Sequence, residues 1–129
     1  WKLYTEEKGL SELIEFIGPL EWKELVPYYH SADAFILFSE YESFSIVLAE
    51  AWSTGTPVIS TSVGIANNMK PELGIQVGQN KPEELKNAML QFINGEVSFD
   101  QKELNSKAAR YSEESILNDW TKLIDKHVK

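Results

Sequence analysis

The sequence predicts an α/β domain built on a parallel, Rossmann-like sheet. Short apolar or β-branched runs alternate along the chain with stretches of helical periodicity, and the runs are 14–17, 34–38, 57–61 and 74–77. The second run, Ala-Phe-Ile-Leu-Phe, is apolar at every position, which is typical of a strand covered on both faces. In such sheets ligands bind beyond the carboxyl ends of the strands.

The first third of the chain is predicted to hold one strand and one helix. Residues 1–9 give a weak signal that fits either a helix remnant or an extended lead-in. The run 14–17 is short, β-branched and closed by a Gly-Pro pair, so we predict a strand there. Apolar residues at helical spacing then predict a helix over 22–29, in which Pro27 kinks or ends an early turn.

The middle of the chain is predicted to pass from strand to loop to helix to strand. After the strand 34–38, a polar loop over 39–43 leads into a buried helix over 45–54, ended by a glycine with a proline two residues later. The strand 57–61 follows. Residues 63–73 are rich in Gly, Asn and Pro and are predicted as a loop with one helical turn.

The last third is predicted to be largely helical. After the strand 74–77, Asn80 as a cap and Pro82 in the first turn predict a helix to about residue 94. Two closing helices are predicted over 102–111 and 112–127, and Ser112 is expected to cap the second.

Composition bounds the class of protein. The 129 residues suit a single domain, predicted over 1–129 with 112–127 as its closing helix. A net charge of −8 with Arg110 as the only arginine disfavours a nucleic-acid partner. The absence of cysteine excludes disulfides and thiolate chemistry, and no apolar run approaches the roughly 20 residues of a membrane span. An intracellular protein is expected, and the initial Trp1 indicates an N-terminally truncated piece.

Two glutamates draw attention to the loop and helix after the second strand. Glu50 lies in a helix that is apolar on nearly every side, where an unpartnered carboxylate is costly. A ligand, a salt bridge or neighbouring backbone would each supply its partner, and the sequence leaves these alternatives open. The start of the same helix offers free N–H groups to an anion, and capping by Ser43 or Ser45 is an alternative that can hold together with it.

Other chemistry is not indicated. His30 and His127 are isolated, no Asp-x-Asp pair stands ready to hold a diphosphate through magnesium, and no phosphate loop or dinucleotide glycine motif occurs. The sequence therefore predicts neither a metal nor a resident cofactor.

The segment 42–59, ESFSIVLAEAWSTGTPVI, resembles a motif of the retaining group 1 glycosyltransferases, carbohydrate-enzyme family 4, which have the GT-B fold. The motif has two glutamates separated by seven residues and a following Gly-Thr-Pro-Val-Ile. Residues 14–18, and Tyr29 with 32–35, also resemble the approach to this motif. The resemblance implies the C-terminal, donor-binding half of such an enzyme.

The resemblance also implies roles for individual residues. The carboxylate of Glu50 would accept hydrogen bonds from the ribose hydroxyls of a nucleotide-sugar, and Glu42, as the catalytic carboxylate, would face the donor sugar. The remaining donor-binding residues implied are Phe44, Ser45, Ile46, Ile17, Gly18 and Gly64.

Some positions depart from the family pattern. Glycines are usual in place of Ser43 and Ser45, and a Gly-Gly pair in place of Gly64-Ile65. Asn67 and Asn68 stand where an acidic residue is common. These departures leave the donor sugar open.

The function implied is transfer of a hexose, with retention of configuration, from a nucleotide-diphosphate sugar to a glycan or glycolipid, without a metal. The partners implied are that donor and a missing N-terminal acceptor domain of the same protein, with membrane contact only through absent regions. A cytoplasmic bacterial protein is expected, with peripheral association at the inner membrane face as an alternative.

Two other interpretations compete with this one. A non-catalytic nucleotide-sugar-binding or interaction domain of the same descent is the closer alternative. An unrelated doubly wound domain, such as a signalling receiver, is disfavoured because the acidic cluster that receivers need is absent. The isolated chain is expected to show no turnover, because donor and acceptor cannot be aligned without the partner domain.

Overall fold

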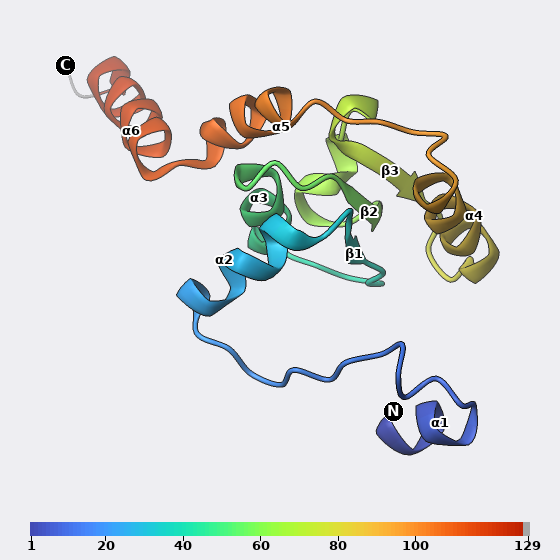
Figure 1. The fold of residues 1–129 in the computed structure, drawn as a ribbon. Helices are drawn as coiled ribbons and strands as arrows, with labels where there is room; N and C mark the ends of the chain where they lie inside the picture. The colour runs from blue at the N-terminus through green and yellow to red at the C-terminus, as the bar shows by residue number, and fades with distance from the viewer. Residues whose placement is uncertain (128–129) are drawn as a thin grey trace.

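A three-stranded parallel sheet in the order β1–β2–β3 lies at the centre of the computed structural model, which describes residues 1–127 (Figure 1). The strands are β1 (Phe35–Leu37), β2 (Val58–Thr61) and β3 (Gly74–Val77). The predicted parallel sheet is confirmed, and these three strands begin and end within one residue of their predicted limits. All four residues of β2 are buried, as expected of a central strand covered on both faces.

Helices precede, connect and follow the strands (Figure 1). They are α1 (Lys2–Glu7), α2 (Trp22–Ser31), α3 (Ile46–Ser53), α4 (Pro82–Ile93), α5 (Gln101–Ala108) and α6 (Glu113–His127). Single 3₁₀ turns lie at Gly64–Asn68, Pro71–Leu73 and Ala109–Tyr111.

The two faces of the sheet carry separate apolar cores. Val58 belongs to the larger core, in which Leu48 and Trp52 of α3 meet Leu104 of α5. Ile59, the next residue of β2, packs with residues of β3 and α4 in the smaller one. Successive side chains of a strand point to opposite faces, so the apolar run of β2 supplies both cores.

The strand predicted over 14–17 is wrong. These residues lie in an irregular stretch between α1 and α2, which runs apart from the sheet (Figure 1), and the side chains of Ile14, Phe16 and Ile17 are each about two-fifths exposed. A strand needs a hydrogen-bonded neighbour, and within residues 1–127 the sheet contains only β1, β2 and β3. An apolar, β-branched run is therefore not sufficient for a strand.

Helix ends follow the predictions in part. Pro27 lies inside α2 without ending it, and the helix begins at a capping box in which the Glu21 N–H donates to Glu24 Oε2 over 2.9 Å. Ser112 caps α6 as predicted, with its hydroxyl accepting from the Ser115 N–H. Asn80 does not cap α4, because its backbone is left-handed with a φ of 55° and the N-cap position falls on Lys81.

The last helix stands apart from the sheet. In Figure 1, α6 projects beyond α5, and none of its residues is buried. Its apolar residues recur at helical spacing and are 43–60% exposed, and they are Ile116, Leu117, Trp120, Leu123 and Ile124. The helix predicted over 112–127 is confirmed, whereas the single domain over 1–129 stays a prediction.

Candidate functional site

The predicted loop at the carboxyl end of β1 is held against the carboxyl end of β2. Thr61, the last residue of β2, donates its hydroxyl to the Ser39 carbonyl oxygen over 2.6 Å. The Ser39 hydroxyl in turn donates to Glu42 Oε1 over 3.0 Å. Glu42 thus lies half-buried where two parallel strands end, which is the edge at which such sheets bind ligands.

Ser45 occupies the N-cap position of α3 in an unusual conformation. Its backbone is left-handed, with φ 69° and ψ 59°, a region that residues other than glycine enter at a cost. The residue is 6% exposed, and its hydroxyl oxygen has no hydrogen-bond partner among residues 1–127. The first turn of α3 has no side-chain cap, so the alternative of a capping serine is not realised at this helix.

Gly64 allows the loop after β2 to lie directly against the entry to α3. A Cβ atom at Gly64 would overlap the Ser45 hydroxyl and would lie 2.5 Å from the Phe44 carbonyl oxygen. The next residue, Ile65, donates its N–H to that same carbonyl over 2.9 Å. The structure therefore brings together the predicted residues Phe44, Ser45 and Gly64.

Glu50 lies on the side of α3, half-buried, with a tyrosine as its partner. Tyr29 of α2 donates its hydroxyl to Glu50 Oε2 over 3.2 Å. Burial raises the pKa of Tyr29 to about 12, and the charge of Glu50 and the hydrogen bond add to the effect. No lysine or arginine in the described part of the chain forms an ion pair with Glu50, so the salt-bridge alternative is not realised there.

A hollow of about 270 Å³ separates this side of α3 from the end of α5. Ile46 and Glu50 line it on α3, and Asn105 and Tyr111 line it on the opposite side. Ile46 is 54% exposed, and Phe44 packs edge-to-face on Tyr111 with ring centroids 5.9 Å apart. Glu50 therefore borders an open space rather than sitting in a closed core.

Ile17 and Gly18, the other two predicted binding residues, lie in the irregular stretch before α2. Ile17 is 42% exposed, and apart from its two chain neighbours no residue has a heavy atom within 4 Å of the position that a Cβ on Gly18 would take. The strand end that was expected to hold them is absent, so their part in binding a base stays a prediction.

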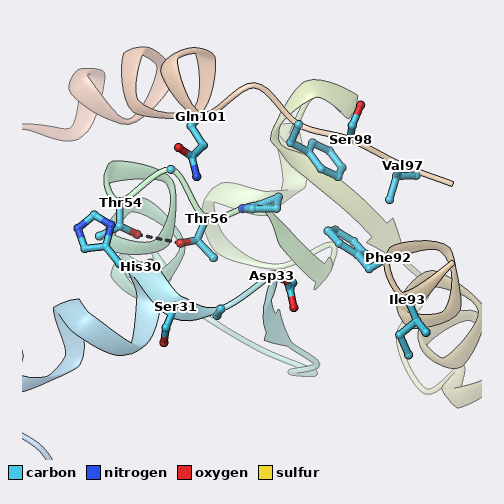
Figure 2. Close-up of a pocket in the computed structure, with 14 residues that line it drawn as sticks. His30, Ser31, Asp33, Thr54, Thr56, Phe92, Ile93, Val97, Ser98 and Gln101 are labelled. Carbon is cyan, nitrogen blue, oxygen red and sulfur yellow. Dashed lines mark hydrogen bonds between the residues drawn. The ribbon is translucent and has the colours of Figure 1, made fainter. Parts of the chain in front are cut away.

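A second hollow, of about 430 Å³, lies at the opposite end of the sheet (Figure 2). Its lining includes Asp33 and Pro57, which shortly precede β1 and β2, so it marks the amino ends of the strands. Thr56 donates its hydroxyl to the Tyr29 carbonyl oxygen over 2.7 Å, and the Thr54 hydroxyl donates to a carbonyl of its own helix. The buried hydroxyl of this hollow is thus already paired.

Tyr29 is the site residue whose role the sequence did not predict. Its spacing from the other apolar residues of 22–29 predicted that it lies on a helix, but nothing in a linear sequence pairs it with a glutamate 21 residues away.

No group of three or more acidic or histidine side chains within residues 1–127 is placed to hold a metal ion. None of the helices in that range is sufficiently long and apolar to cross a membrane.

Glu42 and the uncapped start of α3 lie at the carboxyl edge of a parallel sheet, which is where α/β domains commonly bind ligands. The family model described as "Glycosyl transferases group 1" matches residues 2–95, and the chain belongs to this family. The resemblance stated from the motif 42–59 is confirmed.

The relatives with curated descriptions are longer than this chain. The D-inositol 3-phosphate glycosyltransferase of Corynebacterium urealyticum is 33% identical over 126 residues, covering 92% of this chain and 29% of the relative. The protein of the same description from Corynebacterium jeikeium is 41% identical over 63 residues, or 49% of this chain and 15% of the relative. The chain thus spans less than a third of the length of these relatives.

Two solved structures share the fold. The lipopolysaccharide outer core galactosyltransferase WaaB, in its apo form, superposes with a TM-score of 0.83 at 22% identity, covering 97% of this chain and 36% of that one. Sucrose-phosphate synthase from Thermosynechococcus elongatus superposes with a TM-score of 0.83 at 26% identity, covering 97% of this chain and 33% of that one. Both neighbours are GT-B glycosyltransferases, and the chain corresponds to a Rossmann-like part of that fold.

Proposed function

We propose that this chain is the donor-binding part of a retaining glycosyltransferase that transfers a hexose from a nucleotide-diphosphate sugar to a glycan or glycolipid. Family membership supports transferase chemistry in general. The observation that carries the finer proposal is Glu50, a half-buried carboxylate beside a hollow, bonded through one oxygen to Tyr29. The ribose hydroxyls of the donor would complete its hydrogen bonding.

The start of α3 takes the diphosphate in this proposal. Its first turn lacks a side-chain cap, so backbone N–H groups after Ser45 and the positive end of the helix dipole are available to an anion. The proposal includes no metal, as the resemblance of the motif 42–59 implies. Glu42 lies on the same edge and would face the donor sugar, as expected for the catalytic carboxylate.

The remaining assignments concern the longer protein. Ile17 and Gly18 would contact the base, and an N-terminal domain would hold the acceptor. The protein would act in the bacterial cytoplasm, with peripheral association at the inner membrane face as the alternative. The 129-residue chain alone would bind donor without turnover, because catalysis needs donor and acceptor held in line.

Titration calorimetry with UDP, GDP and ADP tests the donor site. The Glu50→Gln variant is expected to bind its nucleotide more weakly by roughly 1.5 to 3 kcal/mol, the value of a hydrogen bond to a charged group. Glu40→Gln, at an exposed position in the loop that precedes α3, serves as the control and should bind like the parent. Equal affinity of parent and Glu50→Gln for every nucleotide would remove Glu50 from the site.

A second candidate function is a non-catalytic nucleotide-sugar-binding domain. The observation that favours it is Ser45, which holds a left-handed conformation better suited to glycine, at a position where family members usually have glycine. This candidate predicts that a longer protein containing the chain binds nucleotide yet releases none from any sugar donor. A nucleotide-release assay on that protein separates the two functions.

A further inference from the structure

We propose that Tyr29 is a positioning residue that holds one oxygen of the Glu50 carboxylate and leaves the other to face the donor ribose. This inference rests on the proposed function, because it assumes that Glu50 binds the nucleotide. It goes beyond that function by assigning a second residue, from a different helix, to the same interaction.

The tyrosine itself is held firmly in place. Tyr29 is 8% exposed and belongs to the larger apolar core. Its ring packs edge-on against Phe35 of β1, with centroids 5.4 Å apart. Its carbonyl oxygen accepts the Thr56 hydroxyl over 2.7 Å. Phe35 of β1 therefore fixes the ring, Thr56 after α3 fixes the backbone of the same residue, and the hydroxyl can point in few directions.

The glutamate, in contrast, has a flexible side chain. Its unbranched carbon chain loses rotamer freedom when a ligand immobilises the carboxylate. The hydrogen bond from the Tyr29 hydroxyl to Glu50 Oε2 restricts that freedom before any ligand arrives. Within the described residues no hydrogen bond to Oε1 is found, so this oxygen is the one left for a ribose hydroxyl.

The tyrosine stays a donor under ordinary conditions. Burial and the charge of Glu50 raise the pKa of Tyr29 to about 12, so the hydroxyl keeps its proton at neutral pH. A neutral donor holds the carboxylate without cancelling its charge. A lysine in the same place would cancel it. Glu50 therefore remains a strong acceptor for the ribose.

The test measures nucleotide binding by the 129-residue chain and its Tyr29→Phe, Glu50→Gln and double variants. The probes are whichever of UDP, GDP and ADP binds and its 2′,3′-dideoxy counterpart. Tyr29→Phe is expected to weaken binding of the ribonucleotide about two- to tenfold, the usual effect of losing one pre-ordered side chain. Binding of the dideoxy nucleotide should not change, and in the Glu50→Gln background Tyr29→Phe should add no further loss.

Tyr28→Phe is the matched control. Tyr28 neighbours Tyr29 on the same helix and is 43% exposed, and its substitution should leave both affinities unchanged. Circular dichroism melts of each variant confirm folding, since phenylalanine keeps the ring that fills the core.

The outcomes separate this inference from the proposed function. If Glu50→Gln weakens ribonucleotide binding and Tyr29→Phe does not, the positioning role is wrong and the donor site stands. If Tyr29→Phe weakens both nucleotides alike, or adds its full loss to that of Glu50→Gln, the tyrosine is only structural and the inference is overturned. If parent and Glu50→Gln bind equally, or neither binds, the proposed function itself fails.

Discussion

The two ends of the sheet differ in how completely their polar groups are paired. At the amino end, around the hollow of Figure 2, the buried hydroxyl of Thr56 donates to the Tyr29 carbonyl oxygen. At the carboxyl end, the hydroxyl of Ser45 is buried without a partner among residues 1–127, and the Ser45 backbone is left-handed. The unpaired hydroxyl and the left-handed backbone are both unfavourable, and both lie at the edge where parallel sheets bind ligands.

This difference teaches that a hollow alone is a poor guide to a site. The hollow at the amino end, about 430 Å³, exceeds the one of about 270 Å³ that Glu50 lines. Unpaired buried groups and backbone strain are uncommon in native proteins, and they concentrate at functional sites.

The largest difference is expected between two glycines. Gly64→Ala, at the carboxyl end, forces a left-handed alanine against the Phe44 carbonyl oxygen, and we expect a loss of about 3 kcal/mol of unfolding free energy. Gly55→Ala, at the amino end, meets mainly the flexible Gln101 side chain at 3.1 Å, and we expect about 1 to 2 kcal/mol. Urea denaturation measures both. Equal losses would mean that the carboxyl edge is no more tightly constrained than the amino edge.

Removing a hydroxyl at the amino end should destabilise the chain. Thr56→Val keeps the shape but removes the hydrogen bond to the Tyr29 carbonyl oxygen, and we expect a cost of about 1 to 2 kcal/mol. Thermal unfolding followed by circular dichroism is the measurement. A neutral result would show that the amino end does not depend on this pairing.

The same kind of change at the carboxyl end should have the opposite sign. Ser45→Gly relieves the left-handed strain and removes the unpaired hydroxyl, which together outweigh the backbone entropy of glycine, and we expect a gain of about 1 kcal/mol. Ser45→Ala removes the hydroxyl but retains the backbone strain, so it measures the effect of the hydroxyl alone. Ser43→Gly, at an exposed neighbour, is the control and should not stabilise. Destabilisation by Ser45→Gly would contradict the account of this edge.

The effect confined to the narrowest range of conditions appears only at alkaline pH. Folding raises the pKa of Tyr29 from 10.0 to about 12, so the folded chain keeps a proton that the unfolded chain releases. The stability contributed by this group is complete below pH 10.0 and is lost as the pH rises toward about 12. Urea unfolding measures the free energy of unfolding of the parent and of Tyr29→Phe at each pH. The difference between the two should show this decline. A flat difference would mean that the hydroxyl is not buried against Glu50.

The sequence predicted the sheet and the order of its helices because those depend on local periodicity. Runs such as 34–38 could be assigned from composition, and β1 lies within it. The run 14–17 is also short and β-branched, yet it forms no strand, because strand formation depends on a neighbour that local sequence does not specify. Asn80 failed as a cap for a similar reason, since its left-handed backbone serves the turn instead.

The sequence predicted which site residues lie together only where those residues are close along the chain. Glu42, Ser45 and Glu50 fall within one loop and helix, so their proximity follows from the local fold. The contacts of Gly64 with that loop and of Tyr29 with Glu50 join segments far apart in sequence. Such contacts are set by packing of whole elements, and a single sequence does not contain them.

Amide chemical shifts of the ¹⁵N-labelled chain, titrated with UDP or GDP, test the central claim most directly. If the nucleotide binds at the carboxyl edge, the largest shifts will fall on the amides of residues 44–47, where α3 begins, and those of Thr54, Thr56 and Gln101 will change little. Shifts concentrated on Thr54, Thr56 and Gln101, or no shifts with either nucleotide, would contradict it.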